Sequence, residues 1–144
     1  MQQFVYEGNN DIKKEFDEVK PLGETHINEM VQLAALTKPG PFGKGTINFG
    51  HYHGIFENDK LVAMTGQRLH VQNYTEISAV CTHPDYTGKG YANTLMQHQL
   101  KLILQQAQQP FLHVREDNER AIALYKRLGF TISRPMNFYF MKRE

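Results

Sequence analysis

The segment from Glu76 to Gln106 constrains the fold most, because its residue pattern changes from that of a strand to that of a helix across a short turn. Thr75 to Thr82 is rich in β-branched and apolar residues, which is typical of a strand. From Gly88 to Gln106 apolar side chains instead recur every four residues, at Ala92, Met96, Leu100 and Leu104. That spacing predicts an amphipathic helix. The sequence therefore predicts a strand, a glycine turn and a helix in succession.

The residues before this unit predict a helix and an antiparallel meander. A short edge strand is expected at Val19 to Leu22, followed by a helix from about Thr25 to near Pro39. The segment Lys38 to Gly45 is dense in Pro and Gly and predicts a loop. Strands are then expected at His51 to Glu57 and Lys60 to His70, joined by Asn58-Asp59 and continued by the strand that ends at Thr82.

The residues after the long helix predict one more strand, helix and strand. Phe111 to Arg115 is expected to be a strand, and Asn118 is a good N-cap for a helix that ends at Gly129. Phe138 to Met141 is expected to be the last strand. This order of elements predicts an α/β (α+β) sandwich built on one mixed, mainly antiparallel sheet flanked by helices, and not a doubly wound fold.

Length and charge predict one domain without a bias toward nucleic acid or membranes. The chain has 144 residues, and its 16 Lys and Arg against 15 Asp and Glu leave a formal charge of +1. Residues 1–18 are expected to be an N-terminal extension without an assigned structure, and residues 19–144 the single domain. One cysteine, no basic and apolar leader at the N-terminus and no long apolar run together predict a cytoplasmic protein. A homodimer remains open.

The glycine turn before the long helix could hold an anion. Gly88 and Gly90 carry no side chains to obstruct an approaching group, and the free amides of a helix's first turn point outward. On these glycines alone a plain tight turn is the favoured interpretation. The glycine pattern of dinucleotide-binding folds and the Gly-Lys-Ser/Thr of P-loops are both absent from this segment.

Two segments resemble the motifs of the GNAT acetyltransferase superfamily. Thr87-Gly-Lys-Gly-Tyr-Ala92 is similar to its acetyl-CoA signature, which reads Arg or Gln, two residues, Gly, one residue, then Gly or Ala. Asn118 to Phe130 resembles the second hallmark, an Asn-capped helix with a Tyr before Leu-Gly-Phe. The run from Glu76 to Pro84 looks most like the branch that contains glycine N-acyltransferases. The resemblance implies the same mixed sheet that the element order predicts.

The resemblance also implies a cofactor site. Strand backbone groups of Val80, Cys81 and Thr82 would contact the acetyl and pantetheine portions of acetyl-CoA, and Asn118 its pantetheine arm. The amides of the turn and first helical residues would bind the pyrophosphate; these residues are Gly88, Lys89, Gly90, Tyr91, Ala92 and Asn93. Thr87 replaces the usual Arg or Gln, and Lys89 could compensate electrostatically.

The resemblance further implies catalytic residues. Tyr125 would protonate the departing thiolate of coenzyme A or donate a hydrogen bond to it. Glu76, which would share a strand face with Ser78 and Val80, is the preferred general base, and His113 is the second candidate. Apart from the resemblance, a strand Glu is more often a solvated surface residue and a strand His more often packed in a core.

No covalent or metal chemistry is predicted. Cys81 lies in an apolar strand, where a lone cysteine usually serves as a small hydrophobic residue. The histidines lack a nearby cluster of further ligands, so no metal site is expected. The predicted function is direct transfer of an acetyl group from acetyl-CoA to a primary amine, with a small molecule or a peptide as acceptor. A non-catalytic module that binds acyl-CoA is the alternative.

Overall fold

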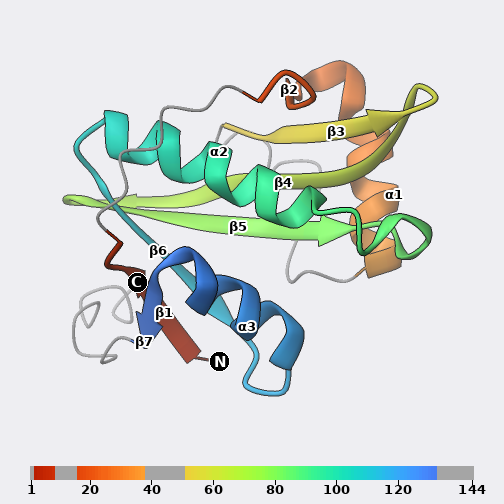
Figure 1. Cartoon of the computed structure of the whole chain (residues 1–144). Coiled ribbons are helices and arrows are strands. Elements are labelled where there is room, and N and C mark those ends of the chain that lie inside the picture. Colours follow the sequence, from red (N-terminus) through yellow and green to blue (C-terminus); the bar gives the residue numbers. More distant parts are fainter. Residues whose placement is uncertain (1, 9–15, 38–50, 133–144) are drawn as a thin grey trace.

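A computed structural model describes residues 2–8, 16–37 and 51–132, which form one sheet with helices on both faces (Figure 1). The strands follow the order β2-β3-β4-β5-β6-β1-β7 across the sheet. They are β1 (Gln2–Tyr6), β2 (Lys20–Pro21), β3 (His53–Glu57), β4 (Lys60–Val71), β5 (Tyr74–Thr82), β6 (Gln109–Val114) and β7 (Phe130–Ile132). The helices are α1 (Ile27–Thr37), α2 (Tyr91–Gln105) and α3 (Glu119–Leu128), with short 3-10 turns at Glu24–His26 and Pro84–Tyr86.

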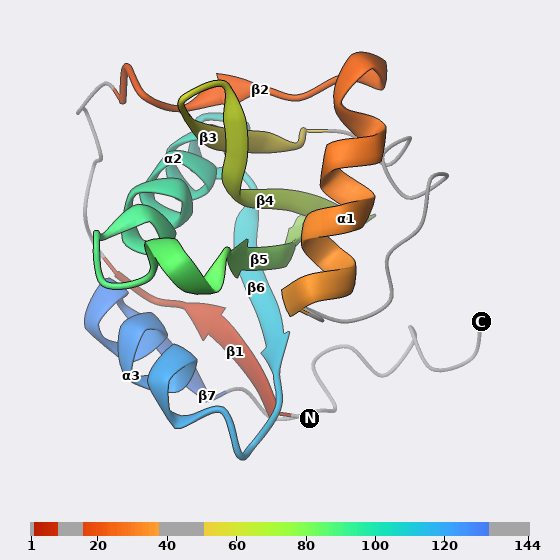
Figure 2. The same cartoon turned by 90° about the vertical axis from the view of Figure 1, so that its right-hand side faces the viewer.

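The described strand pairs are antiparallel except β5 with β6, which are parallel and joined through α2. A parallel pair requires such a crossover, because the chain must return to the same end of the sheet. Helix α1 covers one face of the sheet, and α2 and α3 cover the other (Figure 2). The mixed, mainly antiparallel sheet flanked by helices is the architecture that the sequence predicts.

Local signals place the turn and cap residues as expected. Asn58 and Asp59 both adopt positive φ angles, 52° and 64°, in the turn between β3 and β4. The Oδ1 of Asn118 accepts a hydrogen bond from the Ala121 amide at 3.2 Å, which caps the first turn of α3. Gly129 ends the same helix in the left-handed conformation.

The first residues of the chain are part of the sheet, which corrects the expectation of an N-terminal extension. Strand β1 lies between β6 and β7, where Phe4 pairs with Leu112 on one side and Ile132 on the other. Phe4 and Tyr6 are buried in the core under α2 and α3. The strand is short and its partners come more than 100 residues later, so no local pattern announces the pairing. The loop expected at Lys38 to Gly45 and the strand expected at Phe138 to Met141 lie outside the described residues.

Strand β5 contains a bulge at its centre. Met64 pairs with Cys81 and Gly66 with Ser78. Between these two pairs β5 advances by three residues and β4 by two, so β5 contains one extra residue. Ala79 accommodates the extra residue with φ of 56°, an uncommon conformation for a residue with a side chain. As a result Ile77 and Val80 pack toward α2 and α3, whereas Ala79 and Cys81 pack toward α1. Glu76 and Val80 therefore do not share a face, in contrast to the expectation from simple alternation.

Candidate active site

A cleft of about 1030 Å³ opens where β5 and β6 diverge. The parallel pairing of these strands ends at Glu76 and Phe111, although β5 continues to Thr82 and β6 to Val114. Figure 1 shows the two strands separating beyond that point, with α3 beside the gap. Because the pairing stops, the edge of β5 from Ile77 onward keeps backbone donors and acceptors that β6 does not satisfy.

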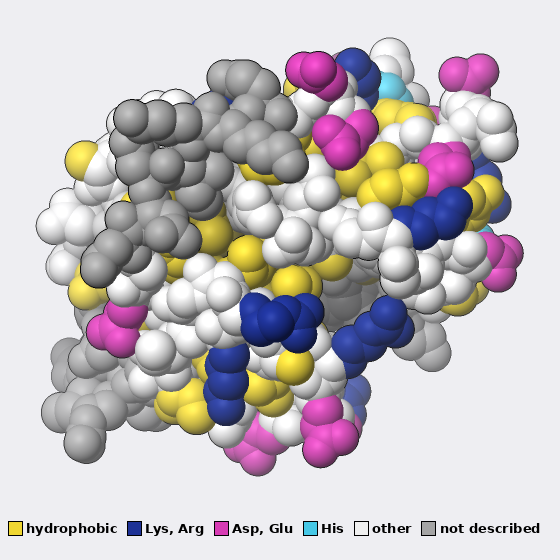
Figure 3. Space-filling view, viewed as in Figure 1, with side chains coloured by type: hydrophobic (Ala, Val, Ile, Leu, Met, Phe, Trp, Pro, Cys, Tyr) yellow, Lys and Arg dark blue, Asp and Glu magenta, His cyan; other side chains and the backbone are white. Residues whose placement is uncertain are grey.

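The cleft gathers almost all the residues expected at the site. Tyr125, Glu76 and His113 line it, as do Val80, Cys81, Thr82, Gly88, Gly90, Tyr91, Ala92, Asn93 and Asn118. Lys89 is not among the residues that line it. The lining also includes four arginines that the sequence reasoning did not identify: Arg68, Arg115, Arg120 and Arg127. Lys and Arg side chains gather beside the hollow between α2 and α3 in Figure 3.

The glycine turn presents the N-terminus of α2 to this cleft. Gly88 and Gly90 have φ angles of 81° and 83°, which residues with side chains adopt only with strain. A Cβ atom on either glycine would meet nothing within 4 Å, so the space beside both is open. Gly90 is the N-cap of α2 and provides no side-chain cap, and the first turn of α2 contains no acidic residue. Free amides and the helix dipole therefore favour an anion at this end of the cleft.

The side chains of Lys89 and Tyr91 both contact Glu57. The Nζ of Lys89 lies 3.3 Å from Glu57 Oε2, and the Tyr91 hydroxyl donates a hydrogen bond to the same oxygen. This hydrogen bond, followed by that of Lys89, lowers the pKa of Glu57. Lys89 therefore lies away from the position in which it could replace the missing Arg or Gln. Arg120 and Arg127 are two cations that do line the cleft, and they share a face of α3 because they are seven residues apart.

Tyr125 projects from α3 into the wall of the cleft. Only 7% of the residue is exposed, and its ring packs against Phe130 with the centroids 6.0 Å apart. Burial raises the pKa of Tyr125 to about 12, with a further contribution from Cys81. Within the described residues its hydroxyl has no hydrogen-bond partner. At neutral pH the side chain is thus a protonated donor at the edge of an open cleft.

The thiol of Cys81 stays protonated at neutral pH. Burial raises its pKa to about 11, an effect that a hydrogen bond with the Thr37 side chain only partly offsets. A thiolate is the reactive form of cysteine, and it is scarce at this pKa. The thiol is therefore a poor nucleophile, in agreement with its assignment as a packing residue.

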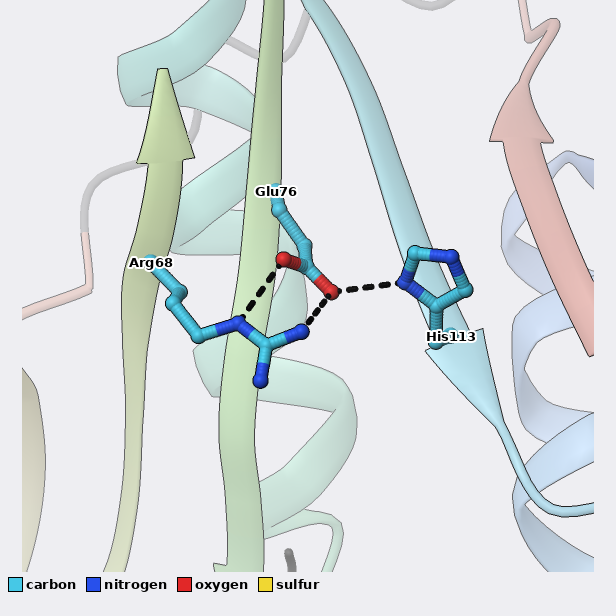
Figure 4. Close-up of polar contacts among 3 residues, drawn as sticks. All are labelled: Arg68, Glu76 and His113. Carbon is cyan, nitrogen blue, oxygen red and sulfur yellow. Dashed lines mark hydrogen bonds and ion pairs between the residues drawn. The ribbon is translucent and has the colours of Figure 1, made fainter. Parts of the chain in front are cut away.

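Glu76 is held between Arg68 and His113 on three neighbouring strands (Figure 4). The Nε and Nη2 atoms of Arg68 donate to Oε1 and Oε2 of Glu76, each at 2.9 Å. The Nδ1 of His113 lies 2.8 Å from Glu76 Oε2. The Glu76 side chain is 2% exposed, against 34% for Arg68 and 26% for His113. The carboxylate is thus a buried, doubly paired group rather than a solvated surface residue.

These contacts distinguish the two candidate bases. A carboxylate can only accept hydrogen bonds, so His113 must carry a proton on Nδ1 to bond to Glu76. In the neutral imidazole Nε2 then has the lone pair and can accept a proton. Figure 4 shows Nε2 on the side of the ring away from Glu76. His113 is therefore better placed to act as a base than Glu76, whose two oxygens are already bonded.

In the described ranges, no group of three or more His, Cys, Asp or Glu side chains is arranged to hold a metal ion. Among the helices of those same ranges, none is long and apolar enough to cross a bilayer.

Comparison with known proteins identifies the family. Residues 52–139 match the family described as FR47-like protein. A putative GNAT-family acetyltransferase from Novosphingobium aromaticivorans superimposes with a TM-score of 0.87 and 35% identity, covering 92% of this chain and 59% of that one. Arabidopsis thaliana Naa50, in complex with the bisubstrate analogue CoA-Ac-MVNAL, shares the fold with a TM-score of 0.71 and 20% identity, over 81% and 83% of the two chains.

A curated relative supports the same assignment. Mycothiol acetyltransferase from Corynebacterium efficiens is 31% identical over 80 residues, which cover 55% of this chain and 27% of the relative. The chain thus spans about a quarter of that protein's length. The similarity to glycine N-acyltransferases in particular stays a prediction. With the matched family and the shared fold together, the chain belongs to the FR47-like family of the GNAT acetyltransferase superfamily.

Proposed function

We propose that this protein transfers an acetyl group from acetyl-CoA directly to a primary amine. The observation that carries the proposal is the single cleft that joins an open helix N-terminus, an unpaired strand edge and the side chains of Tyr125 and His113. These parts match the parts of acetyl-CoA in order: the diphosphate, the amide-containing pantetheine arm and the thioester.

The charges of the cleft support a polyanionic ligand. Among the described residues that line it, four are arginines and one, Glu76, is acidic. Because Glu76 is paired with Arg68, the remaining cations and the α2 amides can balance the phosphates of coenzyme A. The structure of Naa50 with a CoA-containing analogue shows that a relative with this fold binds such a ligand.

The reaction can proceed without a covalent enzyme intermediate. The amine nitrogen attacks the thioester carbon, its proton passes to Nε2 of His113, and the carbon–sulfur bond breaks to release the thiolate of coenzyme A. Backbone amides on the unpaired edge of β5 polarise the carbonyl oxygen as it gains charge. In this proposal the backbone groups of Val80 to Thr82 and the side-chain amide of Asn118 hold the pantetheine arm.

Tyr125 acts by hydrogen bonding to the thiolate. Its pKa of about 12 exceeds that of an ordinary thiol by roughly 3.5 units. Complete proton transfer to the thiolate would then be unfavourable by roughly 5 kcal/mol, at about 1.4 kcal/mol per unit. A charge-assisted hydrogen bond carries no such penalty. Solvent supplies the proton that completes the free thiol and removes the one held by His113.

Two assays on one sample test the proposal. A thermal-shift titration with acetyl-CoA measures binding, and a thiol-release assay over small amines, peptide N-termini and lysine peptides measures turnover. We expect stabilisation by acetyl-CoA together with amine-dependent thiol release. Stabilisation without turnover on any amine would favour the alternative, a non-catalytic acyl-CoA-binding module, and absence of both would contradict the proposal.

A further inference from the structure

The cleft contains an ion pair that the proposed transfer does not explain. The Arg68 side chain on β4 is 34% exposed, whereas the Glu76 side chain is 2% exposed. Two hydrogen bonds of 2.9 Å join them. In the described part of the chain, the other three arginines of the lining form no ion pair or hydrogen bond with Glu76 or His113. Building this pair costs desolvation of two charges, and ion pairs of this kind are seldom net stabilising.

Physical chemistry predicts the state of Glu76 without its cation. Without Arg68 the buried Glu76 carboxylate would keep one donor, Nδ1 of His113, and would lose its paired cation. A carboxyl group buried in the protein interior tends to take up a proton when no opposite charge stabilises the anion. A protonated Glu76 would become a hydrogen-bond donor toward His113. The Nδ1 atom would then accept that bond, and the imidazole proton would reside on Nε2. The lone pair needed for proton abstraction would be lost from Nε2, on the side of the ring away from Glu76.

We propose that Arg68 is a positioning residue that keeps Glu76 ionised and thereby holds the proton of His113 on Nδ1. The three groups form a linear relay across β4, β5 and β6, in which Arg68 acts on the base only through Glu76 (Figure 4). The sheet order brings the three groups together, since each member comes from a different one of the neighbouring strands β4, β5 and β6. The inference rests on the proposed function only for the use of the base, not for the position of the proton.

Nitrogen NMR of histidine-labelled protein tests the position of the proton directly. The protonated and unprotonated ring nitrogens of a neutral imidazole have well-separated shifts, and a His113→Asn variant identifies the His113 signals. We expect wild-type protein near pH 8 to carry the proton on Nδ1 and Arg68→Met to carry it on Nε2. His26, in the turn before α1, serves as an internal reference that should not change. An unchanged tautomer in Arg68→Met would overturn the proposal.

Kinetics test whether Arg68 acts through the base. Arg68→Met should lower kcat by about 10²-fold, the scale of losing a positioned base, with the affinity for acetyl-CoA within about twofold. In a His113→Asn background the same change should have almost no further effect on kcat, because the base on which Arg68 acts through Glu76 is then absent. Additive losses would show that Arg68 acts independently of His113 and would overturn the relay.

Further variants separate folding and charge from position. Arg68→Lys keeps a cation without the two-pronged contact and should retain the Nδ1 tautomer and more activity than Arg68→Met. Arg68→Leu also removes both the charge and the donors, and it replaces the methionine variant if that protein does not fold. Lys126→Met, on the exposed side of α3, controls for loss of a positive charge near the cleft. If wild-type protein acetylates no amine, the proposed function fails, while the NMR result still decides the relay.

Discussion

Replacement of Tyr125 by Phe tests the role of the leaving-group donor. The change removes only a hydroxyl that has no hydrogen-bond partner within the described residues, while the ring can keep its packing against Phe130. The free energy of unfolding should therefore change by less than about 1 kcal/mol. Cofactor affinity should stay within a few-fold, because the hydroxyl gains its partner only as the thiolate forms.

The magnitude follows from the strength of one hydrogen bond to a charged group. Such a bond is worth about 1.5–3 kcal/mol, and each 1.4 kcal/mol in the barrier changes a rate tenfold. The turnover rate of Tyr125→Phe should thus fall by about 10- to 100-fold with little change in KM. Single-turnover thiol release at saturating acetyl-CoA and amine measures it, provided that chemistry limits the rate.

Tyr6→Phe is the matched control. Tyr6 is also buried and packs on the same Phe130, with the ring centroids 5.5 Å apart. Its buried hydroxyl has no hydrogen-bond partner among the described residues, but Tyr6 does not line the cleft. It should leave the turnover rate unchanged. A rate within threefold of wild type for Tyr125→Phe, or an equal loss in both variants, would refute a specific role for the Tyr125 hydroxyl and leave solvent to serve the thiolate.

Three further predictions concern the turn, the thiol and pH. Gly90→Val should weaken acetyl-CoA binding at least tenfold in a thermal-shift titration, since it places a side chain in the open space beside the turn. Because residue 90 has a φ of 83°, the variant should also lose about 1–3 kcal/mol in the free energy of unfolding. Unchanged affinity would place the phosphates elsewhere. Cys81, with its pKa raised to about 11, should resist alkylation at pH 7.5 in native protein but react after denaturation, as mass spectrometry would show; rapid native labelling would disprove the burial. Burial, followed by the neighbouring His98, lowers the pKa of His53 from 6.5 to about 4. The unfolded chain therefore binds the proton more readily than the folded protein does. The free energy of unfolding should fall as the pH drops from 6.5 to 4, by about 2 kcal/mol once partial exposure is allowed for. Urea unfolding at several pH values measures this loss, and an equal pH dependence in His53→Gln would exclude His53 as its source.

The sequence by itself determined the elements whose signals are local. The apolar repeat of α2, the Asn118 cap, the left-handed Gly129 and the turn at Asn58 and Asp59 each depend on residues within one or two turns of chain. Such signals act before any distant contact forms, because periodicity and capping are properties of short segments. The motif resemblance likewise named a set of site residues, and all of them except Lys89 line one cleft. Their roles remain proposals.

Only the tertiary structure decided how distant segments meet. Strand β1 entered the sheet through partners near residues 112 and 131, and the bulge at Ala79 turned Val80 to the opposite face from Glu76. Arg68 and His113 reach Glu76 from 8 and 37 residues away. No single-segment pattern encodes these contacts, because strand order, register and bulges depend on which surfaces pack together. Packing thus places a strand glutamate that resembled a base in a buried position, where its carboxylate contacts an arginine and a histidine.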